Sequence, residues 1–517
     1  MAHQIDTPFD LVRRLEQEAG TSNELLSDRD SGILRKLLRK ANDELDILDQ
    51  EVPGDPSPRR DLLLKRIKRY RVALAPLKAL PPELLNYIFL FAVDRSISLP
   101  LRRHSSLVPW NISYVCSSWR QIALAEPRLW TDIAIDYSHK NHLRLNSIGN
   151  YIISRSRDFG ISLLCTEDAP MVGGHAPEAL VSQRELIAKY ATRVIQLTME
   201  TSKASLVPYL ATSPLQFSWL ESLIVSIRGR YIFNDILTDR LITLFSNTPS
   251  LRKIKLYAFM QYRLLPDLFL VPWGQITDLL LRQVIMSHHT TLALLQQCTN
   301  LTNCTLTLGD NSDPVLENPP EDVNPITIPH LRSLTLQIDI TKLAVHLMDS
   351  VTLPSLHALD VGPNPRRGLI PQALPQDAIL SMLKRSRCKL ATFTCRYRNE
   401  FDALLILRDM PDLRRFSLTA RYLGDPVIGA MTRGEMLMKL EHIQCGLKSI
   451  HPFLDLLEYS WSRKSASKSM DAYKGLMSVN VWGYSLPDRA GAQERIDNLQ
   501  SQIELEGRIV SITLADH

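Results

Sequence analysis

The feature that most constrains the fold of this chain is a recurring apolar phrase. From residue 194 onward, an apolar residue is followed three positions later by a second and two positions after that by a third. In an extended strand alternate side chains share a face, so the last two residues of each phrase point to the same side. Eleven copies occur, 23 to 36 residues apart, starting at Val194, Leu220, Leu251, Ile276, Leu301, Leu331, Leu356, Leu390, Leu413, Leu440 and Leu476.

The segments between the phrases carry helical patterns, for example around residues 291–298 and 378–383. Each unit therefore has the order strand, turn, helix, and one unit alone cannot bury its apolar face. Stacking the units solves this, so residues 138–517 are predicted to form an α/β solenoid with parallel strands inside and helices outside. The spacing is typical of leucine-rich repeats, although the Asn expected after each strand is mostly missing, so irregular turns are expected. The phrases Trp130/Ile133/Ile135 and Ile509/Ile512/Leu514 are candidate terminal caps.

Length and composition agree with a folded chain of several parts. Of the 517 residues, 45% are hydrophobic and 22% are charged, which excludes wholesale disorder. The seven cysteines form no C-x-x-C pair, which argues against a disulfide framework and favours a reducing compartment, the cytoplasm or the nucleus. The longest mostly apolar stretch, residues 84–93, is about half of what a membrane span needs, so neither a signal peptide nor a membrane helix is expected.

Two apolar stripes near the amino terminus predict a helical hairpin over residues 33–78. Three prolines between the stripes, in residues 52–58, cannot continue a helix, so the chain should reverse there. Residues 1–32, with only a short amphipathic stretch, are expected to be loosely ordered. The stripes have the a/d spacing of a coiled coil and consist of Leu34, Leu38, Ala41, Leu45 and Leu48, then Leu63, Ile67, Tyr70, Leu74 and Leu77.

The hairpin is also where the chain concentrates positive charge. Residues 33–78 hold 12 Lys and Arg against seven Asp and Glu, whereas the remainder is balanced. A basic segment can bind nucleic acid, but Tyr70 is the only aromatic residue beside the basic ones, so a base-stacking platform is poorly supported. We expect a packing or self-association element, and nucleic-acid binding stays open as a minor alternative that salt dependence would test.

Residues 79–137 are predicted to be a small helical module. Leu80-Pro81-Pro82-Glu83 fixes a first helical turn, and a wide apolar face follows at Leu84, Leu85, Ile88, Phe89 and Val93. About fifty residues cannot bury such a face together with the second apolar group near Trp119 and Trp130. A separate polypeptide or the rest of the chain should cover what is left.

These residues resemble a known family. The pattern Leu80-Pro81-Pro82-Glu83-Leu84-Leu85-x-x-Ile88-Phe89, followed by Val115-Cys116-x-x-Trp119-Arg120 and Pro127-x-Leu129-Trp130, is similar to the F-box, especially in F-box-like proteins of mushroom-forming fungi. The resemblance implies a three-helix motif that docks on a Skp-type adaptor and through it on a cullin. The connection Asp94 to Trp110 is longer than in the commonest F-boxes. The adaptor contacts implied by position are Leu80, Pro81, Leu84, Ile88, Val115, Cys116 and Trp119.

The outward strand positions of the solenoid are the candidate target-binding residues. Several are basic, so we hypothesise a preference for an acidic or phosphorylated segment of a partner protein. The candidates are Lys253, Lys255, Tyr257, Arg282, Arg396, Arg415 and Trp482.

No phosphate-binding loop, nucleophile elbow or zincin motif occurs, so we expect neither an enzyme nor a cofactor or metal. The preferred function is the non-catalytic, target-recruiting subunit of an SCF-type ubiquitin ligase, with an unidentified target. The alternative is a leucine-rich-repeat scaffold whose helical module only caps the solenoid. Packing of both Trp119 and Trp130 against the first solenoid strands, with Pro81, Leu84 and Ile88 facing solvent, would favour adaptor docking. Internal burial of the Leu84 and Ile88 face would favour the cap.

Overall fold

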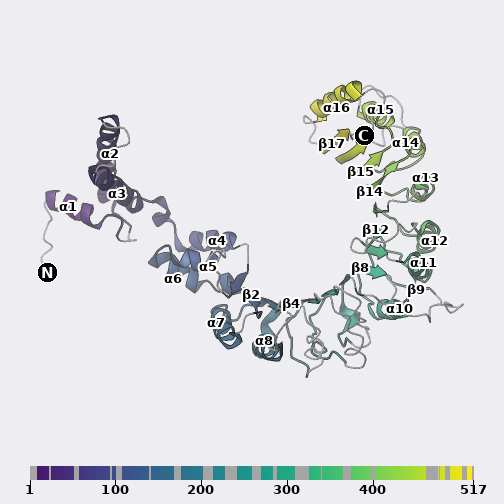
Figure 1. The fold of residues 1–517 in the computed structure, drawn as a ribbon, viewed down its shortest axis with the longest axis horizontal. Coiled ribbons are helices and arrows are strands. Elements are labelled where there is room, and N and C mark those ends of the chain that lie inside the picture. Colours follow the sequence, from purple (N-terminus) through teal and green to yellow (C-terminus); the bar gives the residue numbers. More distant parts are fainter. Residues whose placement is uncertain are drawn as a thin grey trace. The chain divides into compact units, whose positions relative to one another are not determined.

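The structure is a computed structural model, and its contacts divide the chain into two units (Figure 1). The first unit comprises residues 1–135 and 143–162, and the second residues 136–142 and 163–517. The structure describes the whole chain except residues 1–7, 22–24, 52–57, 94–95, 101–107, 139–140, 168–175, 202–212, 228–240, 259–268, 283, 285–287, 309–324, 339, 365–373, 398–401, 462–475, 477, 484–488, 504–508 and 515–517.

Three helices open the first unit: α1 (Pro8–Glu18), α2 (Asp28–Glu51) and α3 (Pro58–Ala73). The predicted stripes of α2 and α3 supply one apolar cluster, in which Leu34, Ile67 and Tyr70 are almost completely buried. The turn expected between the two helices lies largely in residues 52–57, outside the described part of the chain.

Helix α1 lies within the segment 1–32, for which the sequence predicts loose order. The structure differs because Leu11, Leu15 and Ala19 recur at steps of four and are buried in the same cluster as α2 and α3. The Tyr70 hydroxyl donates a hydrogen bond to Glu16 at 3.2 Å, and burial together with this carboxylate raises the pKa of Tyr70 to about 12. Leu77 leaves the predicted stripe and is exposed, because Pro76 starts a separate 3₁₀ turn, η1 (Pro76–Ala79), after α3 has ended.

The helical module follows. Its elements are α4 (Pro82–Ala92), β1 (Ile97–Leu99), α5 (Val108–Ser113), α6 (Ser117–Ala125), the 3₁₀ turn η2 (Pro127–Trp130) and β2 (Asp132–Asp136). The predicted loop from Asp94 to Trp110 is not all loop, since β1 lies inside it and pairs in parallel with β2, Ile97 opposite Ile133. Buried Ile97 and Leu99 explain this, because alternate apolar residues favour a half-buried strand. Residues 94–95 and 101–107 of that segment are outside the described residues.

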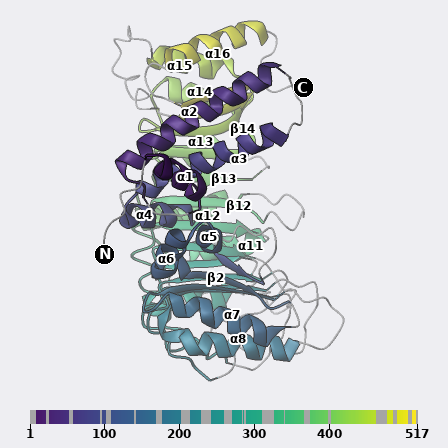
Figure 2. The same cartoon turned by 90° about the vertical axis from the view of Figure 1, so that its left-hand side faces the viewer.

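The second unit is built on a long sheet of parallel strands, visible side by side in Figure 1 and Figure 2. Neighbouring strands pair in register, so that Leu197, Leu223 and Ile254 lie opposite one another, and the same position continues strand by strand to Val479. The described strands in this order are β4 (Val194–Thr201), β5 (Ser222–Ile227), β6 (Lys253–Ala258), β7 (Asp278–Arg282), β8 (Asn303–Leu308), β10 (Ser333–Ile338), β12 (Ala358–Pro363), β13 (Thr392–Cys395), β14 (Arg415–Leu423), β15 (His442–Leu447), β16 (Ser478–Gly483) and β17 (Ile509–Leu514).

Every residue of the eleven predicted apolar phrases is buried. The phrases therefore define the core of the sheet, as the period of two predicts. A solenoid-like α/β fold is the consequence, with repeated units that each contact their neighbours. Of the two proposed caps, Trp130, Ile133 and Ile135 are buried around β2, and Ile512 is buried on β17.

From β7 to β8 and again from β10 to β17, helices return the chain from one strand to the next, and Figure 1 shows α10 to α16 following one another along one side of the sheet. No α-helix is described between β4 and β7 or between β8 and β10. Successive helices pack on each other, as α11 does on α12 and α14 on α15. The described helices are α7 (His142–Arg155), α8 (Ala176–Tyr190), α10 (His288–Gln297), α11 (Thr341–Asp349), α12 (Gln376–Ser386), α13 (Ala403–Arg408), α14 (Asp425–Thr432), α15 (His451–Trp461) and α16 (Arg489–Ile503), with the short turns η3 (Ala191–Arg193) and η5 (Trp273–Gln275).

Polar side chains in the turns before the strands tie each repeat to the previous one. Ser250 donates to the Ser218 carbonyl at 2.8 Å, Gln275 to Thr248 at 2.6 Å, and Asn300 to Gly274 at 2.7 Å. Ser355 continues the series with a bond of 2.6 Å to the Pro329 carbonyl. These bonds give turn carbonyls a side-chain donor and connect each turn to the one before it.

Besides β1, three strands were not predicted. Strand β3 (Ile161–Glu167) buries Ile161, Leu163 and Cys165, but the phrase that would have marked it begins at Gly160, which is not apolar. The short strands β9 (Ile326–Thr327) and β11 (Val351–Thr352) pair with each other in a separate two-stranded sheet. Two-residue strands leave no periodic signal in a sequence.

Candidate partner-binding surfaces

Helix α4 has one buried and one exposed apolar face. Leu85 and Phe89 are only 4% and 1% exposed. On the other side, the exposed fractions are 49% for Leu84, 60% for Tyr87, 45% for Ile88 and 88% for Phe91. These four positions follow the i, i+3, i+4, i+7 spacing that places side chains along one line of a helix, and we call them the outer stripe.

The buried face of α4 packs on α6 through aromatic rings. The rings of Phe89 and Trp119 have centroids 4.9 Å apart and are tilted by 58°. Cys116 caps the start of α6, since its Sγ accepts a hydrogen bond from the backbone N–H of Trp119 at 3.4 Å. This packing determines which side of α4 faces the interior, and it places Trp119 in a contact inside the module.

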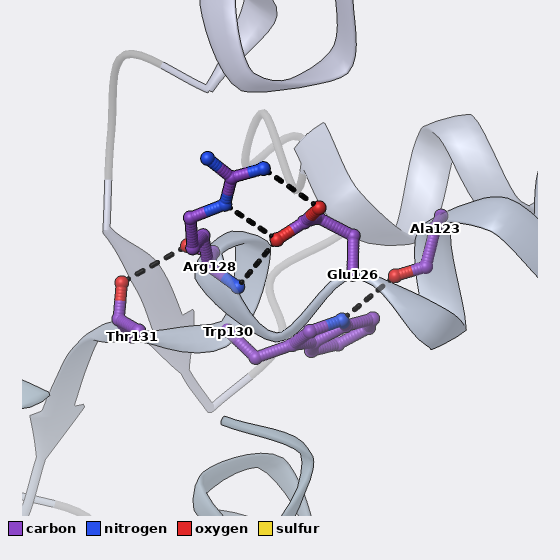
Figure 3. A network of polar contacts seen from close by, with 5 residues as sticks. All are labelled: Ala123, Glu126, Arg128, Trp130 and Thr131. Atoms are coloured by element: carbon purple, nitrogen blue, oxygen red, sulfur yellow. Dashed lines mark hydrogen bonds and ion pairs between the residues drawn. The ribbon is translucent and has the colours of Figure 1, made fainter. Parts of the chain in front are cut away.

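Trp130 is completely buried where the module meets strand β2. Its indole N–H donates to the Ala123 carbonyl at 2.9 Å, as drawn in Figure 3. Its ring lies edge-on to that of Trp110 at 5.0 Å between centroids, and the guanidinium of Arg155 lies 5.6 Å from its centroid. Trp130 therefore holds the end of α6 against the following turn through ring packing and through the hydrogen bond of its indole N–H.

An ion pair beside Trp130 holds the same turn (Figure 3). Glu126 accepts two bonds from the Arg128 guanidinium, at 2.7 and 3.0 Å, and one from the Arg128 backbone N–H at 3.1 Å. The hydrogen bonds from Arg128 are the main reason that the pKa of the Glu126 carboxyl lies below its ordinary value, against an opposing effect of burial. Thr131 closes the turn with a bond of 3.0 Å to the Arg128 carbonyl.

The predicted adaptor contacts divide into two sets. Pro81, Leu84, Ile88 and Val115 face solvent, whereas Leu80, Cys116 and Trp119 are partly buried. Sequence reasoning left out Tyr87 and Phe91 of the outer stripe and Tyr114, which is 74% exposed next to Val115. The helical spacing of Tyr87 and Phe91 relative to Leu84 was the available signal.

The predicted target-binding residues fall into separate groups on the sheet. Lys253, Lys255 and Tyr257 lie on β6, and Arg282 lies opposite Tyr257 on β7. The side chains of Lys253, Lys255 and Arg282 have no hydrogen-bond or ion-pair partner among the described residues. These side chains form one basic group that can meet a ligand.

The remaining candidates lie on β14, on β16 and after β13, separated from β7 by β8, β10 and β12. At about 4.8 Å a step, Arg396 is four strand steps or roughly 19 Å from β7, Arg415 five steps or roughly 24 Å, and Trp482 seven steps or roughly 34 Å. Arg396 is engaged within the sheet: its guanidinium pairs with Asp360 through bonds of 3.1 and 3.0 Å. Burial nevertheless outweighs this partner and raises the pKa of the Asp360 carboxyl. Arg415 is exposed and Trp482 partly buried, so the structure does not unite all seven candidates in one site.

The thiols of the solenoid core offer no reactive group. Cys304, Cys395 and Cys445 are buried, in agreement with a packing role. Burial raises the pKa of Cys395 to about 11 and raises those of Cys304 and Cys445 as well, so the thiolate form is disfavoured. Among the described residues no group of three or more His, Cys, Asp or Glu side chains is arranged to hold a metal ion. No helix in the described part has the length and apolarity needed to cross a bilayer.

Comparisons with known proteins add little to this picture. No family model matches the chain, and a search of curated proteins gives no match. Among solved structures, a Bacteroides fragilis protein determined by a structural genomics consortium matches over 68% of this chain and 74% of its own, with 12% identity and a TM-score of 0.26. A similarity at that level supports no assignment, so the functional argument depends on this chain's own surfaces.

Proposed function

We propose that this protein is a non-catalytic, target-recruiting subunit of an SCF-type cullin ubiquitin ligase, acting in the cytoplasm or the nucleus. Residues 79–137 would be an F-box-like module that docks on a Skp-type adaptor, and the solenoid would hold the target protein. The observation that carries the proposal is the outer stripe of α4, which is 45–88% exposed and which the described residues leave largely uncovered.

The energetic argument starts from the exposed area. Burying a Leu, Ile or Phe side chain that would otherwise be exposed contributes about 1.5–3 kcal/mol. Leu84, Ile88 and Phe91 lie on one line of a helix, so a single partner helix or groove could cover all three. A monomeric protein has no reason to keep such a line in water, whereas a protein with an obligatory partner does.

The packing around the stripe provides the rigidity that docking requires. Phe89 and Trp119 hold α4 against α6, and Trp130 with the Glu126–Arg128 pair holds the end of α6. A pre-organised surface loses little conformational entropy on association. More of the free energy gained by burying apolar side chains then contributes to the affinity. The exposed Pro81 and Val115 extend the surface beyond the stripe, at positions where the resemblance implies adaptor contacts.

The solenoid would contribute proximity rather than chemistry. Its strands form a regular sheet with an exposed basic group at Lys253, Lys255 and Arg282, a surface suited to holding a protein segment. A ligase subunit that binds a target and an adaptor at the same time raises the effective concentration of the target near the ubiquitin-transfer site. No catalytic residue is needed in this chain for that role.

The test is co-purification of the full chain with a Skp-type adaptor and a cullin. Leu84→Asp combined with Ile88→Asp should abolish adaptor recovery, since loss of a central anchor costs about 2 kcal/mol or more, roughly thirtyfold in affinity. Leu143→Asp is the matched control, because Leu143 is 76% exposed in the same unit but lies on α7. Recovery of the adaptor by the double variant would refute the outer stripe as the docking surface, and no recovery by any form would leave only the scaffold alternative.

A further inference from the structure

A cleft of about 370 Å³ opens at the beginnings of the strands of the second unit. Its basic lining consists of Arg252, which directly precedes β6, Arg332, which directly precedes β10, and His330. Between them lie residues of the turns before β7 and β8. The described lining residues include no carboxylate and carry positive charge, and the carboxylate of Asp278, next to Thr277, is engaged by the Thr277 hydroxyl at 2.7 Å.

The repeat register explains why two arginines from distant sequence positions face one cleft. Arg252, Thr277, Thr302 and Arg332 all occupy the position after the first apolar residue of their phrase. Their backbones form a continuous row: Thr277 N–H bonds to the Arg252 carbonyl at 2.9 Å, Thr302 to Thr277 at 2.8 Å, and Arg332 to Thr302 at 2.8 Å. Three strand steps separate the arginines by about 14 Å, so both side chains can reach a ligand that lies between them.

The hydrogen-bond inventory of the cleft favours an acceptor ligand. Arg252 donates from one terminal nitrogen, Nη1, to the carbonyls of Pro249 and Leu251, which leaves Nε and Nη2 available. The described part of the chain offers no hydrogen-bond or ion-pair partner to the side chain of Arg332. Gln275 and Asn300, which also line the cleft, each give one N–H to the preceding turn and have a second N–H to give.

The threonines do not contribute donors. The Thr277 hydroxyl bonds to Asp278 at 2.7 Å, and that of Thr302 bonds to the Thr277 carbonyl at 2.9 Å. Besides the ring N–H of His330, the available donors are therefore concentrated on the two guanidiniums and the two amides. Guanidinium forks and amide N–H groups around a site without carboxylates match a group with several acceptor oxygens and negative charge, which is the chemistry of a phosphate.

We propose that this cleft binds the phosphate of a phosphorylated serine or threonine in a segment of a partner protein. The volume exceeds what a phosphate alone needs and falls in the range of sites for larger ligands, so flanking peptide atoms can enter as well. The segment can continue onto the sheet, where Lys253 and Lys255 extend the positive charge along β6. The identification of this partner as the protein destined for ubiquitin transfer rests on the proposed function. The identification of the ligand as a phosphorylated segment does not.

The experiment measures binding of fluorescein-labelled eleven-residue peptides, with a central phosphoserine and degenerate flanks, to the full chain by fluorescence anisotropy. The same peptides with unmodified serine are the first comparison. We expect at least tenfold tighter binding of the phosphorylated library. Arg252→Gln combined with Arg332→Gln should remove that preference, since each charge-assisted hydrogen bond contributes about tenfold or more in affinity. Equal binding of the two libraries would overturn the proposal.

The matched control is Lys342→Gln combined with Arg408→Gln, which removes the same charge from two exposed positions on helices α11 and α13, outside the cleft lining. This variant should keep the phosphoserine preference within about threefold of the unaltered chain. An equal loss in both double variants would mean diffuse electrostatic attraction and overturn the cleft assignment. Inorganic phosphate as competitor separates the ligand sources: competition as tight as the peptide's would assign the cleft to a free anion instead of a peptide.

Two further measurements keep the outcome clear. Arg252→Lys with Arg332→Lys preserves charge but removes the guanidinium forks, and it should also lose most of the preference. If the glutamine variant fails to fold, this pair decides the result. The variant Leu84→Asp with Ile88→Asp, in contrast, should bind the phosphopeptides normally while losing the adaptor, so failure of the cleft and failure of the ligase proposal are distinguishable.

Discussion

Two adjacent leucines of α4, Leu84 and Leu85, allow a direct test of whether the outer stripe is exposed. Leu84 is 49% exposed and Leu85 is 4% exposed, although both are leucines one position apart on the same helix. Shortening each to alanine removes the same atoms from two different environments. Alanine is also the best helix former, so helix propensity favours neither variant over the other.

The expected magnitudes differ between the two variants. Leu85→Ala leaves a cavity on the buried face of α4. It should lower the free energy of unfolding by about 2–5 kcal/mol, the range for buried leucines. Leu84→Ala removes a side chain that is half in water, and it should change stability by no more than about 0.5 kcal/mol. The difference of about 1.5 kcal/mol or more corresponds to a factor of roughly ten or more in the opening equilibrium of the module.

Native-state hydrogen exchange, resolved by mass spectrometry for peptides from α4 and α6, is the appropriate assay. A chain of two units does not unfold in one step, so a single melting temperature would mix them, whereas exchange reports local opening. Leu85→Ala should lower the protection of both helices at least thirtyfold, and Leu84→Ala should leave it nearly unchanged. Equal losses of protection in the two variants would show that the chain itself covers Leu84, and the reasoning would fail.

Three further predictions concern the turn after α6 and the solenoid. Glu126→Ala should destabilise the module by about 1 kcal/mol through loss of a capping acceptor. Because the folded pKa of Glu126 is lowered, its contribution is present above the carboxyl's ordinary value of 4.5 and is lost as the pH falls through the folded value, so hydrogen-exchange protection of the wild type and of Glu126→Ala should converge in acid. Gly362→Ala would place a methyl carbon 2.7 Å from Cβ of Arg396, so it should displace Arg396 from Asp360 and cost about 1–3 kcal/mol in the protection of β12 and β13. A thiol reagent followed by mass spectrometry should leave Cys304 unmodified in the native chain while it labels the same thiol after denaturation, and rapid native labelling would contradict the buried core.

The repeat array was predictable because its signal is redundant. Each phrase places three apolar residues at fixed spacing, and a parallel register turns every sequence position of the phrase into a spatial row. The failure at β3 shows the limit of the pattern, since one glycine at Gly160 removes the first apolar residue and hides a strand that is buried all the same. The packing of α1 was underestimated for a related reason. Leu11, Leu15 and Ala19 are buried only because α1 lies on α2 and α3, and the sequence does not show which helices pack together.

The binding surfaces were less predictable than the fold. The pairing of Arg396 with Asp360 joins residues 36 positions apart, and its geometry decides that Arg396 is engaged within the sheet. The two arginines of the cleft, Arg252 and Arg332, directly precede their strands. A list of candidate residues restricted to outward strand positions therefore did not include them. The same alignment of repeats that revealed the core contained the signal, because Arg252 and Arg332 stand in one column of it.

The central claim is that the outer stripe of α4 binds a Skp-type adaptor, and calorimetric titration of the purified adaptor into the full chain tests it most directly. We predict saturable binding of one adaptor per chain with a negative heat-capacity change, the signature of apolar burial. The Leu84→Asp and Ile88→Asp double variant should give no binding heat, whereas Leu143→Asp should titrate like the unaltered chain. Absence of binding to the unaltered chain, or equal affinity in the double variant, would contradict the claim.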